Sequence, residues 1–303
     1  MSRGPQLRIP DARQGPGRMP QGLLEALDLV VAKRTAGALP GDRRAAGLGA
    51  GTELAQLRPY EVGDDVRHID AAATARTGEP HVRLHVPERT LTTWIALDVS
   101  PSMAFGTADR LKFDVAEGVV GVIGRLAIRR AGSVGLVTFG AGRPRLLPPR
   151  ASKPGLVALR RAVAEGVVPD GQADPHALGL ALRRLRSVAL QPGLVVIVSD
   201  FRGQEDWVRP LRALGQRHSM LAVEIRDPRE GSLPASGRLS LVDPETGDLI
   251  EVDTSQRALR ERFAALEAAG RAEVAKTLRR LEVTHVVLST EGDWLHELGR
   301  RLQ

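Results

Sequence analysis

From residue 91 onward, short apolar runs alternate with longer segments whose apolar residues recur at helical spacing. Near-continuous apolar runs are typical of strands buried on both faces, and apolar residues three or four positions apart are typical of amphipathic helices. The predicted strands lie at residues 92–100, 132–140, 193–201, 218–225 and 283–289, and the predicted helices at 109–130, 153–165, 175–190, 204–216, 255–281 and 292–302. This alternation predicts an α/β fold with a doubly wound, mainly parallel sheet.

Two β-hairpins are also predicted. Residues 143–147 come directly after the strand at 132–140 and are expected to form its hairpin partner. The run DPETGD separates two short apolar stretches, at 238–242 and 248–252, and reads as a hairpin turn. The sequence therefore predicts a β-hairpin inserted near residues 238–252.

The first 90 residues have a different pattern. Residues 1–18 are rich in Gly, Pro, Arg and Gln, and we expect a disordered tail there. Residues 20–34 have the apolar spacing of a helix, and residues 81–86 alternate like a strand. We therefore expect three parts: the tail 1–18, an N-terminal helical and loop segment 19–90 packed on the main domain, and an α/β domain over residues 91–303.

Composition narrows the function classes. The chain has no cysteine, which excludes disulfides, a thiolate nucleophile and Cys-ligated metals. Its longest stretch without a charged residue is 187–199, too short to span a membrane. The N-terminus lacks the apolar region of a secretory signal, so a soluble, cytoplasmic protein is expected. The net charge is +7, but the signs are mixed and aromatic residues make up 3% of the chain, which does not favour nucleic acid as a partner.

Candidate chemistry lies where two strands end. Asp98 ends the first strand of the domain, and Ser100 and Ser102 follow it; Asp200 ends the strand at 193–201. Ligands of such sheets bind at the carboxyl ends of the strands, and carboxylate and hydroxyl oxygens suit Mg²⁺. The alternative is structural: the serines would cap a turn, and Asp200 would cap the helix at 204–216.

The spacing D-x-S-x-S after a buried strand, with a later Ser-Asp, resembles the metal-ion-dependent adhesion site of von Willebrand factor A-like domains. The upstream run LRPYEVGDDVRHID, continuing through residue 78, and Glu88-Arg89 resemble the bacterial "domain of unknown function 58" family. The resemblance runs from about residue 47 to 303.

The resemblance implies that Asp98, Ser100, Ser102 and Asp200 hold Mg²⁺ or Mn²⁺. The family's middle loop usually reads Gly-Gly-Thr-Asp, whereas residues 171–174 read Gly-Gln-Ala-Asp. Ala173 has no hydroxyl, so one ligand is missing and cation affinity is expected to be weakened. Asp174, or water, is the candidate replacement.

The block at residues 57–78 is dense in charge, and two interpretations stay open. Its charged residues form a structural network that docks the segment onto the main domain, or they form a surface for a partner protein. An acid–base active site is not favoured, because no nucleophile lies among them. The residues concerned are Arg58, Tyr60, Glu61, Asp64, Asp65, Arg67, Asp70 and Arg76.

The leading functional hypothesis is a non-enzymatic protein-interaction module, in which a partner's carboxylate completes the shell of the cation. The resemblance implies a MoxR-type AAA+ ATPase as partner, acting in the assembly or maturation of a client protein. One alternative is a structural scaffold with a degenerate metal site. The other is a Mg-dependent aspartyl phosphohydrolase with Asp98 as nucleophile, although Ser100 stands where such phosphatases carry a second aspartate. The cation bridge requires Asp98 and Asp200 to be neighbours with no Lys or Arg head group between them.

Overall fold

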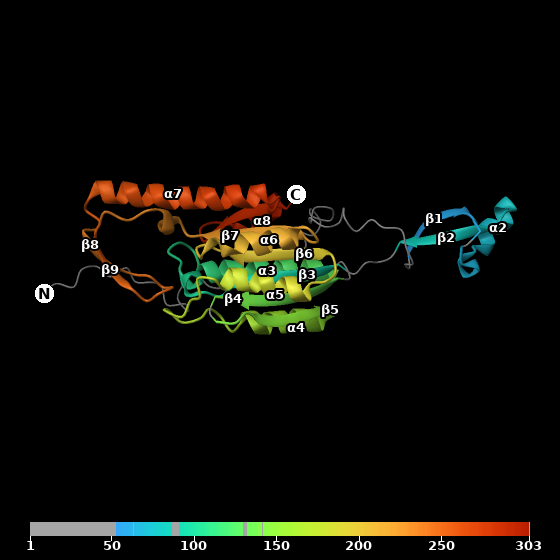
Figure 1. The fold of residues 1–303 in the computed structure, drawn as a ribbon, viewed down its shortest axis with the longest axis horizontal. Helices are drawn as coiled ribbons and strands as arrows, with labels where there is room; N and C mark the ends of the chain where they lie inside the picture. Colours follow the sequence, from blue (N-terminus) through green and yellow to red (C-terminus); the bar gives the residue numbers. More distant parts are fainter. Residues whose placement is uncertain (1–52, 63, 87–90, 130–131, 141, 303) are drawn as a thin grey trace. The chain divides into compact units, whose positions relative to one another are not determined.

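The computed structural model describes residues 53–62, 64–86, 91–129, 132–140 and 142–302. They divide into two compact units, one containing the described residues up to 86 and the other those from 91 onward, and each unit is described by itself (Figure 1). The predicted tail at 1–18 and the predicted helix at 20–34 lie outside the described residues.

The larger unit is built on a six-stranded sheet with the order β10-β7-β6-β3-β4-β5. All neighbouring strands are parallel except β5, which is antiparallel to β4. The chain starts at the central strand, winds outward on one side, returns to the centre and winds outward on the other. This confirms the predicted doubly wound, mainly parallel sheet. The strands are β3 (Thr92–Asp98), β4 (Ser133–Phe139), β5 (Arg145–Ala151), β6 (Gly193–Ser199), β7 (Ser219–Arg226) and β10 (Thr284–Ser289).

Helices cover both faces of this sheet (Figure 1). Strand β3 shows why, since Ile95 and Leu97 pack into the core on one face while Trp94 and Ala96 pack into the core on the other. One face is covered by α3 (Lys112–Arg129), α4 (Ser152–Val163) and α8 (Trp294–Arg301). The other is covered by α5 (Ala177–Val188), α6 (Val208–Gly215) and the last turns of α7 (Arg257–Arg280).

The predicted inserted hairpin is present. Strands β8 (Arg238–Val242) and β9 (Leu249–Asp253) pair antiparallel and form a two-stranded sheet of their own. Short 3-10 turns complete the unit: η2 (Pro101–Ala104) after β3, η3 (Glu205–Trp207) before α6, and η4 (Pro228–Gly231) after β7. Among the described residues, no helix combines the length and apolar character needed to cross a membrane.

The smaller unit is an antiparallel pair of strands with two short helical turns between them. Strand β1 (Glu53–Pro59) pairs with β2 (His81–Val86), and η1 (Val66–His68) and α2 (Ala71–Thr77) lie between them in sequence. Helix α2 ends at Gly78, whose φ of +77° is the left-handed conformation that glycine adopts without strain. The family-like block at 57–78 therefore forms most of a small folded unit.

Candidate functional site

Asp98 and Asp200 meet at the carboxyl end of the sheet. Asp98 is the last residue of β3, and Asp200 directly follows β6, which is the parallel neighbour of β3. Both side chains are buried. Because the winding of the sheet reverses between these two strands, this edge is where α/β proteins of this kind bind their ligands.

The two predicted serines lie in the same cluster. The backbone N–H of Ser100 donates to Oδ1 of Asp98 at 2.9 Å. The hydroxyls of Ser100 and Ser102 lie 3.1 Å apart, and the Ser102 side chain is close enough to Asp200 to help lower the pKa of that carboxyl, after the larger effects of burial and Lys112. Four oxygen-bearing side chains that the sequence singled out are thus connected around one point.

Two features of the backbone fix the positions of the loops that carry Ser100 and Asp200. Gly140, at the end of β4, has a φ of +148°, and a Cβ there would lie 2.4 Å from the backbone nitrogen of Ser100. A side chain at this position would push the serine loop away from the sheet. Phe201, directly after Asp200, has a φ of +56°, which is strained for a side-chain-bearing residue. Its buried ring packs edge-on against Trp207 at 5.7 Å between centroids, and this packing holds the turn.

The Asp98 carboxyl has a raised pKa. Burial raises its pKa, and the nearby negative charge of Asp200 raises it further, to about 7. Its hydrogen bonds come from neutral groups: the Ser100 N–H, and the hydroxyl of Ser199, which donates to Oδ2 at 2.5 Å. A cation placed beside Asp98 would stabilise the ionised form that burial disfavours.

Asp200 is neutralised by Lys112, which sequence reasoning missed. The Lys112 Nζ donates to Oδ2 of Asp200 at 2.6 Å and to Oε1 of Glu230 at 2.5 Å, and the lysine side chain is fully buried. Burial alone would lower the pKa of Lys112, but the two carboxylates outweigh it and the pKa is raised. Burial likewise raises the pKa of Asp200, but Lys112 outweighs it and the pKa is lowered.

A signal for Lys112 exists in the sequence. It lies three positions before Val115, four before Ala116 and seven before Val119, on the apolar face that packs into the core. A lysine on such a face needs a buried partner, because an unpaired buried charge is costly. The sequence does not identify that partner, since Asp200 follows 88 positions later.

Lys112 is part of a larger network of ion pairs, which continues through Glu230. Glu230 also accepts from Arg271 at 3.1 Å and lies 3.3 Å from Arg202. Arg271 in turn contacts Glu224 at 3.2 Å, and Glu224 accepts from Arg226 and is hydrogen-bonded to His285. Asp200 is therefore linked through charged side chains to helix α7 and strands β7 and β10.

The Asp174 carboxylate caps a turn in the middle loop, and its place among the ligands of a cation stays a prediction. Its Oδ1 accepts from the backbone N–H of His176 at 2.9 Å, just before α5. Its backbone N–H donates to the carbonyl of Gly140 at 2.8 Å, so the middle loop itself lies beside the serine loop. The carboxylate has a turn-capping role in this arrangement, and Ala173 supplies no hydroxyl.

One further acid reaches the serine loop from the inserted hairpin. Oε1 of Glu245 accepts a hydrogen bond from the backbone N–H of Ser102 at 2.9 Å. No local pattern in the sequence indicates this contact, because the two residues are 143 positions apart.

The donor set suits a hard divalent cation. The buried Asp98 carboxyl and the hydroxyls of Ser100 and Ser102 are oxygen donors, and Asp200 adds a second carboxylate. Within the described residues, no group of three or more Asp, Glu or His side chains could hold a metal by itself. A cation here would therefore depend on the serine hydroxyls, as the adhesion-type pattern requires.

Comparison with known proteins identifies the family. The family model described as "Protein of unknown function DUF58" matches residues 56–273. The chain belongs to the DUF58 family. The uncharacterized protein Rv1480 of Mycobacterium tuberculosis is 38% identical over 279 residues, covering 91% of this chain and 87% of the relative. A shorter relative, the uncharacterized protein MAV169 of Mycobacterium avium, is 42% identical over 123 residues, covering 41% of this chain and 72% of the relative.

Solved structures of low sequence identity also align with the chain. The conserved hypothetical protein BatB from Bacteroides thetaiotaomicron has a TM-score of 0.46 at 14% identity, covering 70% of this chain and 97% of that one. The SpRpn10 VWA domain has a TM-score of 0.40 at 11% identity, covering 69% of this chain and 93% of that one.

The DUF58 block at 57–78 uses its predicted charges to build the small unit. Arg58 donates to Asp64 at 2.7 Å, and its guanidinium lies 3.8 Å from Glu61. Most of the other predicted residues make local contacts: Asp65 accepts from the Arg67 N–H, Asp70 from the Ala73 N–H, and Arg76 donates to the Ala72 carbonyl. The backbone N–H of Tyr60 donates to the carbonyl of Pro80. These contacts fit a structural role within the unit, and docking onto the larger unit stays a prediction.

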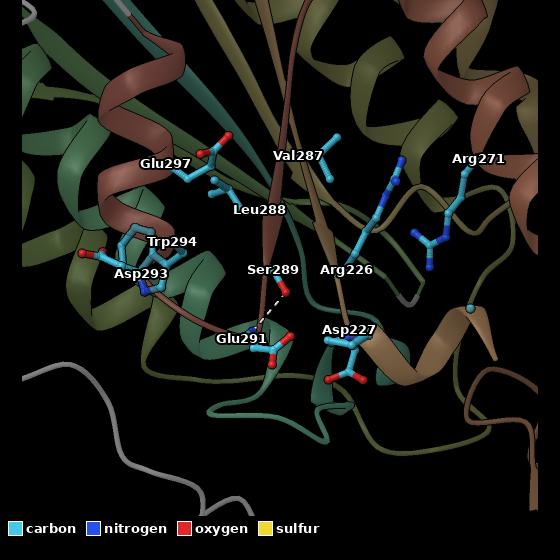
Figure 2. A pocket seen from close by; sticks show the side chains of 12 residues that line it. Arg226, Asp227, Arg271, Val287, Leu288, Ser289, Glu291, Asp293, Trp294 and Glu297 are labelled. Atoms are coloured by element: carbon cyan, nitrogen blue, oxygen red, sulfur yellow. Dashed lines mark hydrogen bonds between the residues drawn. The ribbon is translucent and has the colours of Figure 1, made fainter. Parts of the chain in front are cut away.

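A separate pocket lies beside α8, at the ends of β7 and β10. Its volume is about 470 Å³, and neither Asp98 nor Asp200 lines it. Figure 2 shows β10 between Trp294 and Glu297 on one side and Arg226 and Arg271 on the other. Both arginines are already paired with Glu224, so the pocket of this DUF58 protein does not offer free cations to an anionic ligand.

Proposed function

We propose that this DUF58 protein is a non-enzymatic protein-interaction module of the cytoplasm whose contact site is the Asp98 cluster. The observation that carries the proposal is the convergence of Asp98, Ser100, Ser102 and Asp200 at the reversal point of the sheet. A buried carboxyl with hydroxyls beside it offers oxygen ligands, and no acid–base pair with an exposed nucleophile accompanies them in the described part of the chain.

A divalent cation, Mg²⁺ or Mn²⁺, would supply positive charge beside Asp98 and an open position for a partner's carboxylate. Asp98, Ser100 and Ser102 would hold the cation. Lys112 donates to Oδ2 of Asp200, so it orients this carboxylate and meets part of its charge before any ligand arrives. Because the site is buried, an acidic group that enters it is shielded from water and its attraction to positive charge is strong.

The partner proposed is a MoxR-type AAA+ ATPase, with which the module would act in the assembly or maturation of a client protein. This step rests on the family resemblance, now supported by membership of the DUF58 family. The site would recognise an acidic side chain on the ATPase or on the client.

Lys112 favours a second candidate, a scaffold whose site works without metal. Its ammonium already supplies one positive charge to Asp200, and Ala173 lacks the hydroxyl of the usual middle loop. The phosphohydrolase alternative is weaker, because the Asp98 carboxyl is buried and accepts hydrogen bonds from Ser100 and Ser199, and Ser100 stands where such phosphatases carry a second aspartate.

The test is capture of the MoxR-type ATPase from the same genome on the immobilised full chain, in Mg²⁺ and in EDTA. We expect capture in Mg²⁺ to fall at least about tenfold with Asp98→Ala, the loss of one strong charge interaction. Asp170→Asn, which removes an exposed acid from a nearby loop, is the control and should leave capture unchanged. Capture indifferent to both EDTA and Asp98→Ala would remove the cation bridge and leave the scaffold.

A further inference from the structure

The tip of the β8–β9 hairpin touches two of the loops that form the site. Glu245 accepts from the Ser102 N–H at 2.9 Å, and the carbonyl of Pro244 accepts from the Gly171 N–H at 2.9 Å. The first contact is on the serine loop and the second on the middle loop. In Figure 1 the hairpin extends from the start of α7 toward this end of the sheet.

The tip also fits closely against the middle loop. A Cβ built on Gly171 would lie 3.8 Å from the Cα of Gly247, and one built on Gly247 would lie 3.7 Å from the Cα of Gly171. Both glycines have positive φ values, +74° and +78°. The two backbones are therefore in van der Waals contact, and the tip is seated against the loop.

The turn itself is organised to present Glu245. The Asp243 carboxylate accepts from the Glu245 N–H at 2.9 Å and from the Thr246 hydroxyl at 3.2 Å. The Asp243 carbonyl accepts from the Gly247 N–H at 2.8 Å. Because these bonds fix the turn, the glutamate is held in place at little further cost in conformational entropy.

The rest of the hairpin is loosely held. Its arms form a separate two-stranded sheet, and Val242, Leu249 and Ile250 are 55%, 64% and 56% exposed. An isolated two-stranded hairpin is only marginally stable in water. At its base Leu239 is buried, so the tip can leave the site while the base stays anchored.

We infer that the β8–β9 hairpin is an internal pseudo-ligand, and that the acid it displays identifies the ligand class of the site: a glutamate or aspartate presented on an exposed turn. The inference rests on the proposed function, because it assigns to Glu245 the place that a partner's carboxylate takes. When no partner is bound, Glu245 already occupies the Ser102 N–H and Lys112 already pairs with the Asp200 carboxylate. A partner's acidic turn must displace the hairpin tip, which lowers its apparent affinity by the fraction of open molecules.

The test uses a fluorescent hexapeptide with the tip sequence DPETGD and the full chain, with binding followed by fluorescence polarisation in Mg²⁺. Glu245→Ala should bind the peptide about tenfold tighter than the wild type, the factor that one charge-assisted hydrogen bond is worth. Glu251→Ala removes an exposed acid from β9 of the same hairpin and should bind like the wild type. A peptide with Gln in place of Glu should lose the gain.

A covalent clamp gives a second measurement. The chain has no cysteine, and a Cβ on either Gly171 or Gly247 would lie within 3.8 Å of the other residue's Cα, so the two positions are close enough to cross-link. Both positions have positive φ, so each cysteine strains its turn, and thermal melting of the reduced variant Gly171→Cys with Gly247→Cys checks that it folds. The oxidised variant should bind no more peptide than the wild type, even when Glu245→Ala is added. Reduction should restore tight binding by the triple variant.

The outcomes separate this inference from the proposed function. If Glu245→Ala binds the peptide no better than the wild type, or if the oxidised clamp does not block binding, the pseudo-ligand is wrong whatever Asp98 does. If Glu245→Ala gains binding that is indifferent to EDTA and to Asp98→Ala, the pseudo-ligand stands and the cation bridge fails.

Discussion

At the scale of single residues, Lys112 has the largest consequence for the site. Its ammonium is fully buried and is shared between Asp200, which is buried, and Glu230, whose side chain is 7% exposed. Removing one member of such a group leaves the others charged and unpaired, which typically costs about 3–5 kcal/mol. The same change removes the built-in positive charge next to Asp200.

Lys112→Met should therefore lower the free energy of unfolding by about 3–5 kcal/mol in EDTA. Mg²⁺ or Mn²⁺ should restore part of that loss, because a divalent cation held at the Asp98 cluster would lie beside the Asp200 carboxylate that the variant leaves unpaired. Urea unfolding of the full chain, with and without the cation, measures both effects.

The matched control is Lys153→Met, which changes an exposed lysine at the start of α4. It should unfold like the wild type in either buffer. A Lys112→Met protein of full stability would show that Lys112 does not neutralise Asp200. A variant that is destabilised but indifferent to the cations would show that no cation binds beside Asp200.

The residues of the site differ in how far the sequence predicts them. Asp98, Ser100, Ser102 and Asp200 follow apolar strands, so the rule for strand ends identifies them. Lys112 and Glu245 join the site through contacts between distant segments, and no local pattern encodes those pairings.

At the scale of elements, the connection after β7 depends on one acid. The Asp227 carboxylate accepts from the N–H and the hydroxyl of Thr107 at 2.7 and 2.6 Å, from the hydroxyl of Thr290 at 2.7 Å and from the Arg229 N–H at 2.9 Å. It also forms a capping box at η4 with Glu230, the residue that holds Lys112. Asp227 thus joins the loop before α3, the end of β10 and the network around the site.

Asp227→Ala should lower the free energy of unfolding by about 3 kcal/mol at pH 7, because several buried donors lose their acceptor. Burial raises the pKa of Asp227, but the hydrogen bonds from Thr107 and its neighbours outweigh it and the pKa is lowered. A lowered pKa means that the carboxylate stabilises the fold above its unfolded pKa of about 3.9 and loses that effect as the pH falls through the folded value.

The difference in urea stability between the wild type and Asp227→Ala should accordingly be constant above about pH 5 and shrink as the pH falls from there to pH 3. Asp170→Asn, at an exposed position, should track the wild type across the range. A difference that is constant with pH would show that the ionised state of Asp227 does not contribute.

Elements are predicted well where one physical pattern dominates. The strands β3 and β6 are buried on both faces and read as continuous apolar runs, and DPETGD between two short apolar stretches gives the hairpin. The start of α3 is less well predicted: residues 109–130 have helical spacing, but the helix begins at Lys112, and the Asp109 carboxylate instead accepts from the Gly292 N–H. A contact with a loop that lies far away in the sequence decided that boundary.

At the scale of the whole molecule, the order of the strands follows from the winding. Each parallel crossover needs a helix on one face, and the reversal between β3 and β6 creates the edge where the cluster lies. The sequence therefore predicts the class of fold and the edge that carries the chemistry. It does not predict that an inserted hairpin reaches that edge, because nothing in the composition of the insertion specifies where its tip lies.

If the Asp98 cluster binds a divalent cation, titration calorimetry of Mn²⁺ and Mg²⁺ into the full chain should give about one ion per chain, with the heat abolished by Asp98→Asn and retained by Asp170→Asn. No heat of binding, together with a melting temperature that millimolar cation does not raise, would rule out the cation and leave Lys112 as the positive charge of this site.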